Sequence, residues 1–191
     1  MVAAALTDNA VEIAPGVHWV GALDPHLRSF DIILKTANGT SYNSYVVRGD
    51  NGVAIIDTVK ENFADDFFRR LESVATYEEI TTIVLNHLEP DHSGALPELL
   101  KRAPQAKVYL SSRAQMMLKA LLKPSGEKPP EYIPVTTDDT VDLGLHFRQR
   151  HLGLVVQQVL MQLVDLQACV FTTARHGGAR GVAFLEAQGE I

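Results

Sequence analysis

Asn86-His87-Leu88-Glu89-Pro90-Asp91-His92-Ser93-Gly94 is the stretch that decides the fold prediction, because His87, Glu89, Asp91 and His92 are all potential metal ligands. The preceding run, residues 81–85, is β-branched and apolar, which predicts a buried strand. The following run, residues 94–101, predicts a helix with Ser93 or Asp91 as its N-cap and Pro97 in its first turn. The four side chains are therefore expected where a strand ends and a helix begins, which is where α/β proteins place functional groups.

The residue types in this stretch indicate a metal site. Imidazole and carboxylate ligands together suit first-row metals such as zinc, iron and manganese. Carboxylates that are buried close together need a cation to neutralise them, and Pro90 stiffens the turn that carries them. The alternative interpretation is a polar, solvated loop.

The pattern His87-x-Glu89-x-Asp91-His92 resembles the signature of the metallo-β-lactamase fold, with Glu89 where that signature has its second histidine. In this respect it is similar to the flavodiiron proteins, and the resemblance covers roughly residues 12–144. The additional hard oxygen ligand favours iron over zinc. The other segments that carry the resemblance are Pro15 to Gly21, Phe30 to Ile33, Gly39 to Tyr45, Ile55 to Lys60 and His92 to Glu98.

The resemblance implies an α/β (α+β) fold, a metallo-β-lactamase-like αβ/βα sandwich. It also implies reduction of oxygen or nitric oxide at a non-haem diiron site, with His87 and Glu89 on one iron and Asp91 and His92 on the other. An external flavin or a rubredoxin-like protein would supply electrons, FMN is expected only in full-length relatives, and a homodimer is possible. We expect residues 1–144 to form the front part of a truncated metal domain and residues 145–191 a divergent tail, with no flavodoxin domain.

Composition limits the other functional classes. The net charge of −6 gives no electrostatic case for binding nucleic acid or an anionic membrane. The single Cys169 fits a reducing compartment, and residues 1–6 lack the features of a signal peptide. The apolar run 153–166 is too short and too polar to span a bilayer. We therefore expect a cytoplasmic protein.

Periodicity predicts the remaining elements of the front part. Hairpin strands that suit one sheet of a sandwich come first, with a turn at Asn38-Gly39. Helix 61–75 should bury Phe63, Phe67, Leu71 and Val74 and leave its charged residues mostly outward. Helix 113–122 should begin at a Ser112 cap and bury Met116, Met117, Leu118 and Leu121. The predicted strands are residues 17–23, 30–35, 40–48, 53–57, 107–110, 132–135 and 140–143.

Several single residues have two interpretations. Asp57 either supports the metal loop from behind or is a turn carboxylate. His26 is a candidate for the entrance of the site, whereas His18, Tyr42 and Tyr45 are expected to pack. The family should supply further ligands later in the chain, but His151, Asp165 and His176 lack the expected context and are interpreted as structural or solvated.

Three functional hypotheses therefore remain at this point. The first is a diiron oxidoreductase. The second is a metal-dependent hydrolase of the same fold, which Glu89 argues against. The third is a non-catalytic remnant with an incomplete site.

Overall fold

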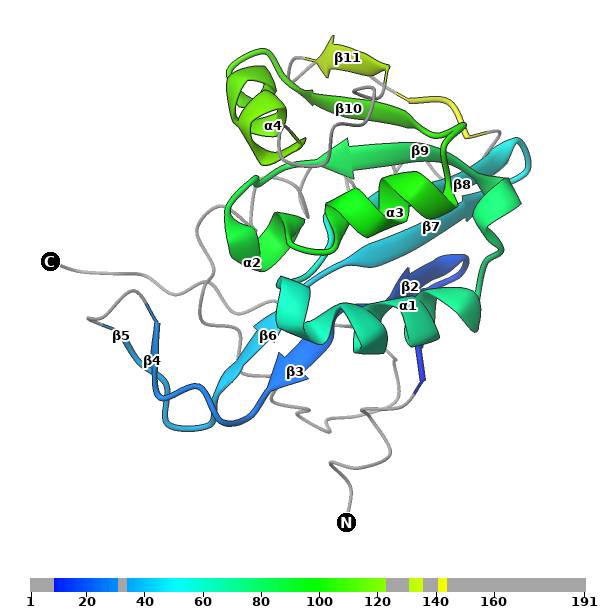
Figure 1. Ribbon diagram of the computed structural model, residues 1–191. Coiled ribbons are helices and arrows are strands. Elements are labelled where there is room, and N and C mark those ends of the chain that lie inside the picture. The colour runs from blue at the N-terminus through cyan, green and yellow to red at the C-terminus, as the bar shows by residue number, and fades with distance from the viewer. Residues whose placement is uncertain (1–8, 31–33, 123–130, 136–140, 144–191) are drawn as a thin grey trace, which may run out of the picture.

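The chain is described by a computed structural model that covers residues 9–30, 34–122, 131–135 and 141–143 (Figure 1). A seven-stranded sheet in the order β1-β2-β7-β8-β9-β10-β11 organises these residues. The strands of this sheet are β1 (Val11–Ala14), β2 (Val17–Trp19), β7 (Tyr45–Gly49), β8 (Gly52–Ile56), β9 (Ile80–Leu85), β10 (Lys107–Ser111) and β11 (Tyr132–Val135).

The sheet changes character at β8. Strands β1, β2, β7 and β8 pair antiparallel, whereas β8, β9, β10 and β11 pair parallel. Each parallel connection contains helix, as parallel pairing requires a crossover. The helical segments are η2 (Glu61–Phe63), α1 (Ala64–Glu72), η3 (Tyr77–Glu79), α2 (Pro90–Ser93), α3 (Leu96–Arg102) and α4 (Ala114–Leu122). Within the described ranges, no helix is long and apolar enough to cross a membrane.

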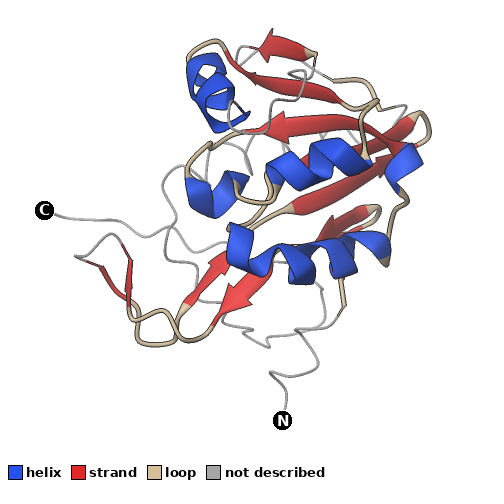
Figure 2. Cartoon of the chain, viewed as in Figure 1, coloured by secondary structure: helices blue, strands red, loops and turns tan. Residues whose placement is uncertain are grey.

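Helices α1 and α3 cover one face of the sheet, as Figure 2 shows. Ile55, Ile83 and Val108 stand side by side on three parallel strands, and each is fully buried. Helix residues Phe67 and Leu99 are fully buried in the same cluster. Each such side chain contributes roughly 1.5–3 kcal/mol by leaving water. A second cluster lies on the opposite face and consists of Val17, Val47, Ala54, Ile56 and Leu143.

The predicted strand 17–23 is broken in the structure. Strand β2 ends at Trp19, and β3 (Ala22–Asp24) pairs with β6 (Thr40–Tyr42) in a separate two-stranded sheet. The bend falls at Gly21, where a Cβ would overlap the Tyr42 carbonyl oxygen. The close approach of the two backbones therefore requires glycine at the point where the chain leaves the main sheet.

The predicted hairpin around Asn38-Gly39 is also wrong. The structure has a longer arm, in which β4 (Ser29–Phe30) pairs with β5 (Leu34–Lys35) beyond the β3–β6 pair. Gly39, with φ +84°, lies in the turn between β5 and β6, and these two strands do not pair with each other. The predicted strand 40–48 is accordingly divided between β6 and β7, which belong to different sheets.

The predicted helix 61–75 is shorter in the structure: η2 precedes α1, α1 ends at Glu72, and Phe63 and Val74 lie outside α1 and are only partly buried. Phe67 and Leu71 are fully buried, whereas Arg70, expected to point outward, is also buried. Position 70 lies three residues after Phe67 and so shares its face. Arg70 reaches across this face, donates from Nη1 to the Gly21 carbonyl oxygen at 2.8 Å and packs beside the Trp19 ring.

Helix α4 departs from the prediction in two ways. Met116 and Met117 are 75% and 51% exposed rather than buried, while Leu118 is buried as expected. The amide of Ala114 donates to Ser111 Oγ, so Ser111 rather than Ser112 caps the first turn. Both methionines precede Leu118 in sequence, and of the three residues only Leu118 packs into the core.

Near the end of the described chain, β11 matches the predicted strand 132–135. Residues 141–143 form no strand. The predictions for the tail 145–191, including the apolar run 153–166, His151, Asp165 and His176, lie outside the described residues.

Candidate metal centre

The ligand-rich stretch begins where β9 ends at Leu85, as predicted, but its helix differs from the expectation. Helix α2 starts at Pro90, and α3 resumes at Leu96 after a short interruption. Pro90 occupies the start of α2, where its fixed φ suits a helix. Ser93 caps no helix and instead donates from Oγ to the carbonyl oxygens of Leu88 and Glu89. Asp91 and His92 therefore lie inside a helical turn rather than in an open loop.

Three of the four predicted ligands form a compact group. His87, Glu89 and Asp91 each offer a ligand atom, and these atoms lie within 4.8 Å of one another. His87 Nε2 is 3.4 Å from Glu89 Oε2. One imidazole and two carboxylates on such a loop suit a first-row divalent metal.

His92 lies beside this group and connects to it through Asp91. Its Nε2 is 3.8 Å from Asp91 Oδ2, and its ring stands nearly perpendicular to the His87 ring at 5.4 Å between centroids. Within the described part of the chain, the buried Nδ1 of His92 has no hydrogen-bond partner. Burial lowers the pKa of His92, with the nearby Asp91 carboxylate opposing this shift. The neutral imidazole that burial favours is the form that binds metals.

Asp57 holds the backbone of this loop from below. Its carboxylate is buried and accepts hydrogen bonds from the amides of Asn86 (2.7 Å) and His87 (3.4 Å). Its Oδ2 lies 3.9 Å from His92 Nδ1. Burial raises the pKa of Asp57 to about 7, and the amide donors oppose that shift. Of the two interpretations of Asp57, this geometry favours support of the loop.

The residue after Asp57 fixes the other end of the stretch. Thr58 donates to the His92 carbonyl oxygen from both its amide, at 2.8 Å, and its Oγ1, at 2.9 Å. Ser44 Oγ in turn donates to the Asp57 carbonyl oxygen at 2.9 Å. The ends of two neighbouring strands, β8 and β9, are thereby joined at one edge of the sheet, directly beneath the candidate ligands.

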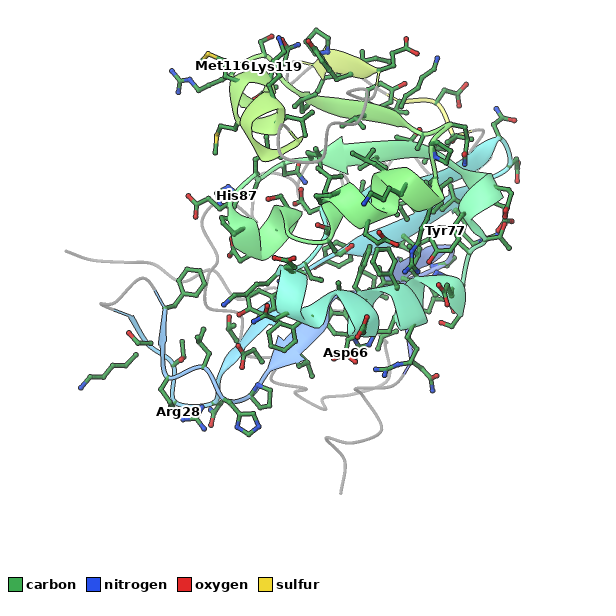
Figure 3. The ribbon with its side chains drawn as sticks, in the orientation of Figure 1. Arg28, Asp66, Tyr77, His87, Met116 and Lys119 are labelled. Atoms are coloured by element: carbon green, nitrogen blue, oxygen red, sulfur yellow. The ribbon has the colours of Figure 1, made fainter. Side chains whose placement is uncertain are left out.

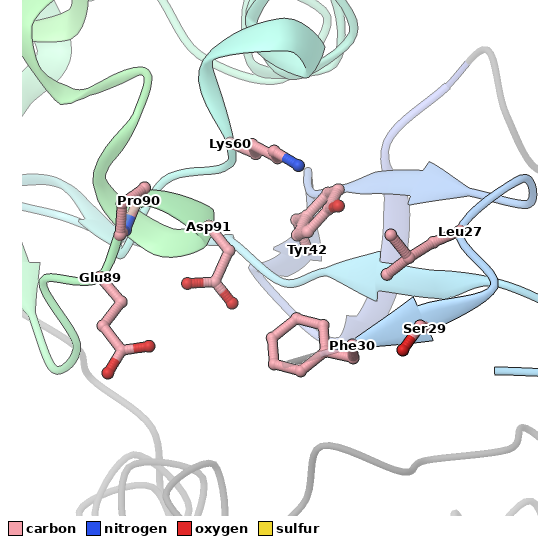
Figure 4. A pocket seen from close by; sticks show the side chains of 8 residues that line it. All are labelled: Leu27, Ser29, Phe30, Tyr42, Lys60, Glu89, Pro90 and Asp91. Atoms are coloured by element: carbon pink, nitrogen blue, oxygen red, sulfur yellow. The ribbon is translucent and has the colours of Figure 1, made fainter. Parts of the chain in front are cut away.

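A cavity of about 250 Å³ lies between the arm and the candidate ligands (Figure 4). Asp91 turns its carboxylate into this space toward Phe30 of the arm. Tyr42 forms a further part of the wall; its hydroxyl donates to Asp24 Oδ2 at 3.1 Å. Burial and the Asp24 carboxylate raise the pKa of Tyr42 to about 12, so the wall carries a neutral phenol. The lining residues are Leu27, Ser29, Phe30, Tyr42, Lys60, Glu89, Pro90 and Asp91.

The single-residue expectations have mixed outcomes. Tyr42 is buried as predicted, and His18 and Tyr45 are half-buried. His26 does not line the cavity, whereas the adjacent Leu27 does. Sequence reasoning did not identify Lys60 as a residue of the site. The signal was available, because Lys60 follows β8 and the carboxyl ends of adjacent parallel strands meet at one edge of a sheet.

Residues 37–164 match the family model of the metallo-beta-lactamase superfamily. This match covers more than half of the chain, and the chain belongs to that superfamily. Within it, the chain is similar to the metal-domain part of flavodiiron proteins, as the sequence resemblance predicted.

Three relatives illustrate this similarity. The type A flavoprotein fprA of Rhodobacter capsulatus is 67% identical over 134 residues, covering 70% of this chain and 31% of that protein. The anaerobic nitric oxide reductase flavorubredoxin of Pectobacterium carotovorum is 36% identical over 136 residues, covering 71% and 26%. The rubredoxin oxygen:oxidoreductase of Desulfovibrio gigas superposes with a TM-score of 0.63 at 34% identity, covering 71% and 33%. The chain thus spans about a third or less of the length of each relative.

Proposed function

We propose that this chain is the metal-binding part of a flavodiiron-type oxidoreductase that reduces oxygen or nitric oxide at a non-haem diiron site. The observation that carries this proposal is the group formed by His87, Glu89 and Asp91, whose ligand atoms lie within 4.8 Å of one another. Glu89 favours iron over zinc because it replaces an imidazole with a hard oxygen ligand. Two relatives are named for reactions with oxygen and nitric oxide.

The residues present supply part of the ligand set of such a metal pair. Glu89 and Asp91 lie close together on one cavity wall, and a cation would neutralise their mutual repulsion. In our assignment, His87 and Glu89 hold one iron, and Asp91 and His92 hold the other. Bound iron would supply the redox chemistry. Asp57 and Thr58 would keep the loop in place, and the arm would limit access of water.

The same proposal extends to partners. Electrons would come from an external flavin or a rubredoxin-like protein, in keeping with the name of the Desulfovibrio gigas relative. The net charge of −6 gives no support to a nucleic-acid or membrane partner and is consistent with a cytoplasmic location. Within the chain, we assign residues 1–144 to the front part of the metal domain and residues 145–191 to a divergent tail, the first part of which, to residue 164, the family model also matches. We also propose that the chain forms a homodimer.

Metal analysis of the purified chain tests the proposal. After incubation with ferrous iron and removal of excess metal, we expect bound iron, with fewer than two per chain because the ligand set is incomplete. Glu89→Ala should lower this content, whereas Asp65→Asn, at an exposed carboxylate on α1, should leave it unchanged. Selective binding of zinc would favour the hydrolase hypothesis. Absence of any bound metal would favour the non-catalytic hypothesis and refute the proposal.

A further inference from the structure

One positive charge lies on the wall of the cavity. Lys60 is a lining residue, and its Nζ is 6.0 Å from the centroid of the Tyr42 ring. Figure 4 shows the ammonium group directed over Tyr42, on the opposite side of the cavity from the Glu89 carboxylate. Within the described residues, the ammonium forms no ion pair. Its charge is therefore available to a molecule that enters the cavity.

The backbone of Lys60 is held rigidly against the ligand-bearing segment. Its carbonyl oxygen accepts the amide of Phe63 at 2.9 Å, and the preceding carbonyl, of Val59, accepts the amide of Ala95 at 3.0 Å. Gly94 lies so close that a Cβ there would stand 2.9 Å from the Lys60 carbonyl carbon. The ammonium and the candidate ligands are thus carried on backbones that are packed directly together.

The Tyr42 ring gives the side chain a defined direction. Phe63 packs against this ring at 5.1 Å between centroids, and Asp24 accepts its hydroxyl hydrogen bond. An ammonium over an aromatic face is attracted electrostatically to the ring. This attraction holds the cation at the cavity without consuming its hydrogen-bond donors.

The size and charge of the cavity indicate the kind of ligand. Its volume of about 250 Å³ is below that of pockets for drug-sized molecules, which begin at about 300 Å³. Glu89 and Asp91 would repel an anion while they are uncompensated, but a bound metal cation reverses that local field. Once metal is bound, Lys60 and the metal group attract the same small anion from two sides.

We propose that Lys60 is an anion-binding residue, which holds a small inorganic anion of the azide or nitrite class in the cavity beside the metal group. This inference rests on the proposed function, since it needs a metal at the candidate ligands. The ammonium supplies one charge-assisted hydrogen bond, and arginine at this position would supply the same charge.

Azide binding to the iron-loaded protein tests this inference, measured by calorimetry and by the azide-dependent absorption of the oxidised iron. Lys60→Met should weaken azide binding roughly ten- to a hundredfold, the equivalent of one charge-assisted hydrogen bond. Lys60→Arg should retain most of the affinity. Iron content, measured on the same samples, should be equal in all variants.

Lys119 provides a matched control. Its Nζ also lies over a tyrosine ring, that of Tyr132 at 5.6 Å, but Figure 3 places it on α4, away from His87. Lys119→Met should therefore leave the affinity for azide unchanged. Equal azide affinity in wild-type protein and Lys60→Met, at equal iron content, would overturn this inference alone. Failure of wild-type protein to retain iron would refute the proposed function, and this inference with it.

Discussion

Asp57 shows at the level of one residue how the site is prepared. It is the one non-glycine residue with positive φ (+55°) in the described part of the chain. A conformation of this kind costs of order 1–3 kcal/mol and persists only where the surroundings hold it. Here the amides of Asn86 and His87 bond to the carboxylate, while Ser44 and Val84 bond to the backbone of Asp57. The strained turn thereby places a carboxylate beneath the metal loop.

Burial of this carboxylate predicts a pH dependence of stability in the metal-free protein. The pKa of Asp57 is raised by burial from 3.8 to about 7. Between these values the folded state keeps the proton and the unfolded state releases it, so stability falls as the pH rises through this window, by up to about 4 kcal/mol. Asp57→Asn removes the titrating group, and asparagine tolerates the left-handed conformation. Urea unfolding is measured at pH 4.5 and pH 8, taken as roughly the two ends of the window. The free energy of unfolding should fall less between these two pH values in the variant than in the wild type.

His92 contributes the opposite slope to both proteins. Because burial lowers the pKa of His92, its stability contribution is lost as the pH falls through its titration range. The contribution of Asp57 is therefore the difference in pH dependence of stability between Asp57→Asn and wild type, and neither protein alone reports it. An identical dependence on pH in the two proteins would contradict the prediction.

Glu89 carries the expected preference for iron. Replacing Glu89 with histidine restores the imidazole of the general metallo-β-lactamase signature, and we expect occupancy to move from iron toward zinc. Competition between equal concentrations of the two metals, followed by elemental analysis, measures the shift. The exposed side chain of Glu89 (53%) makes a folding defect in this variant unexpected. Equal iron-to-zinc ratios in the two proteins would remove the chemical reason for choosing a reductase.

At the level of elements, Arg102 ties α3 to α1 and η3. Its guanidinium lies 4.0 Å from the Phe68 ring centroid and donates to Tyr77 OH (2.8 Å), Glu98 (2.9 Å) and Glu72 (3.1 Å). Arg102→Ala should lower the free energy of unfolding by about 1–2 kcal/mol, and Arg102→Lys should not restore it, because lysine lacks the planar fork. Chemical denaturation measures both. Arg69→Ala, which affects an exposed pair with Asp66, should cost less than about 0.5 kcal/mol.

Gly94 sets the distance between two helical segments. A Cβ at this position would overlap the backbone nitrogen of Glu61, and a backbone atom cannot move aside as a side chain can. Gly94→Ala should therefore cost more than about 2 kcal/mol, although alanine is the better helix former. Thermal unfolding provides the measurement. A neutral or stabilising effect would show that η2 and the segment joining α2 to α3 can separate without loss.

The predictions from sequence succeeded where the signal is local. The runs that became β8, β9, β10 and β11 have continuous apolar stretches with turns beside them, and each strand was placed within about a residue or two. The arm was mispredicted because Asn38-Gly39 gives a true turn signal, but strand pairing decides whether such a turn closes a hairpin. Arg70 was misplaced for a related reason, since the Gly21 carbonyl oxygen that accepts its hydrogen bond comes from a distant segment.

The same distinction applies to the candidate site at the level of the whole molecule. His87, Glu89, Asp91 and His92 were found from one short stretch, because their spacing alone brings them together. Lys60 and Phe30 line one cavity with Glu89 and Asp91. The position of Lys60 after β8 could have suggested its place, but no spacing rule in the sequence brings Phe30 of the arm to this cavity. The cavity therefore required the structure, whereas the candidate ligands did not.

The change from antiparallel to parallel pairing at β8 has a consequence for how the chain acquires its shape. During synthesis, β7 and β8 can pair as soon as both have emerged, since a two-residue turn joins them. Strand β9 must wait for α1 to cross over the sheet, and the metal loop follows it. The segment that carries the candidate ligands is thus added to a sheet in which β7 and β8 are already paired. Pulse-labelling hydrogen exchange during refolding should find the amides of β7 and β8 protected before those of β9 and β10.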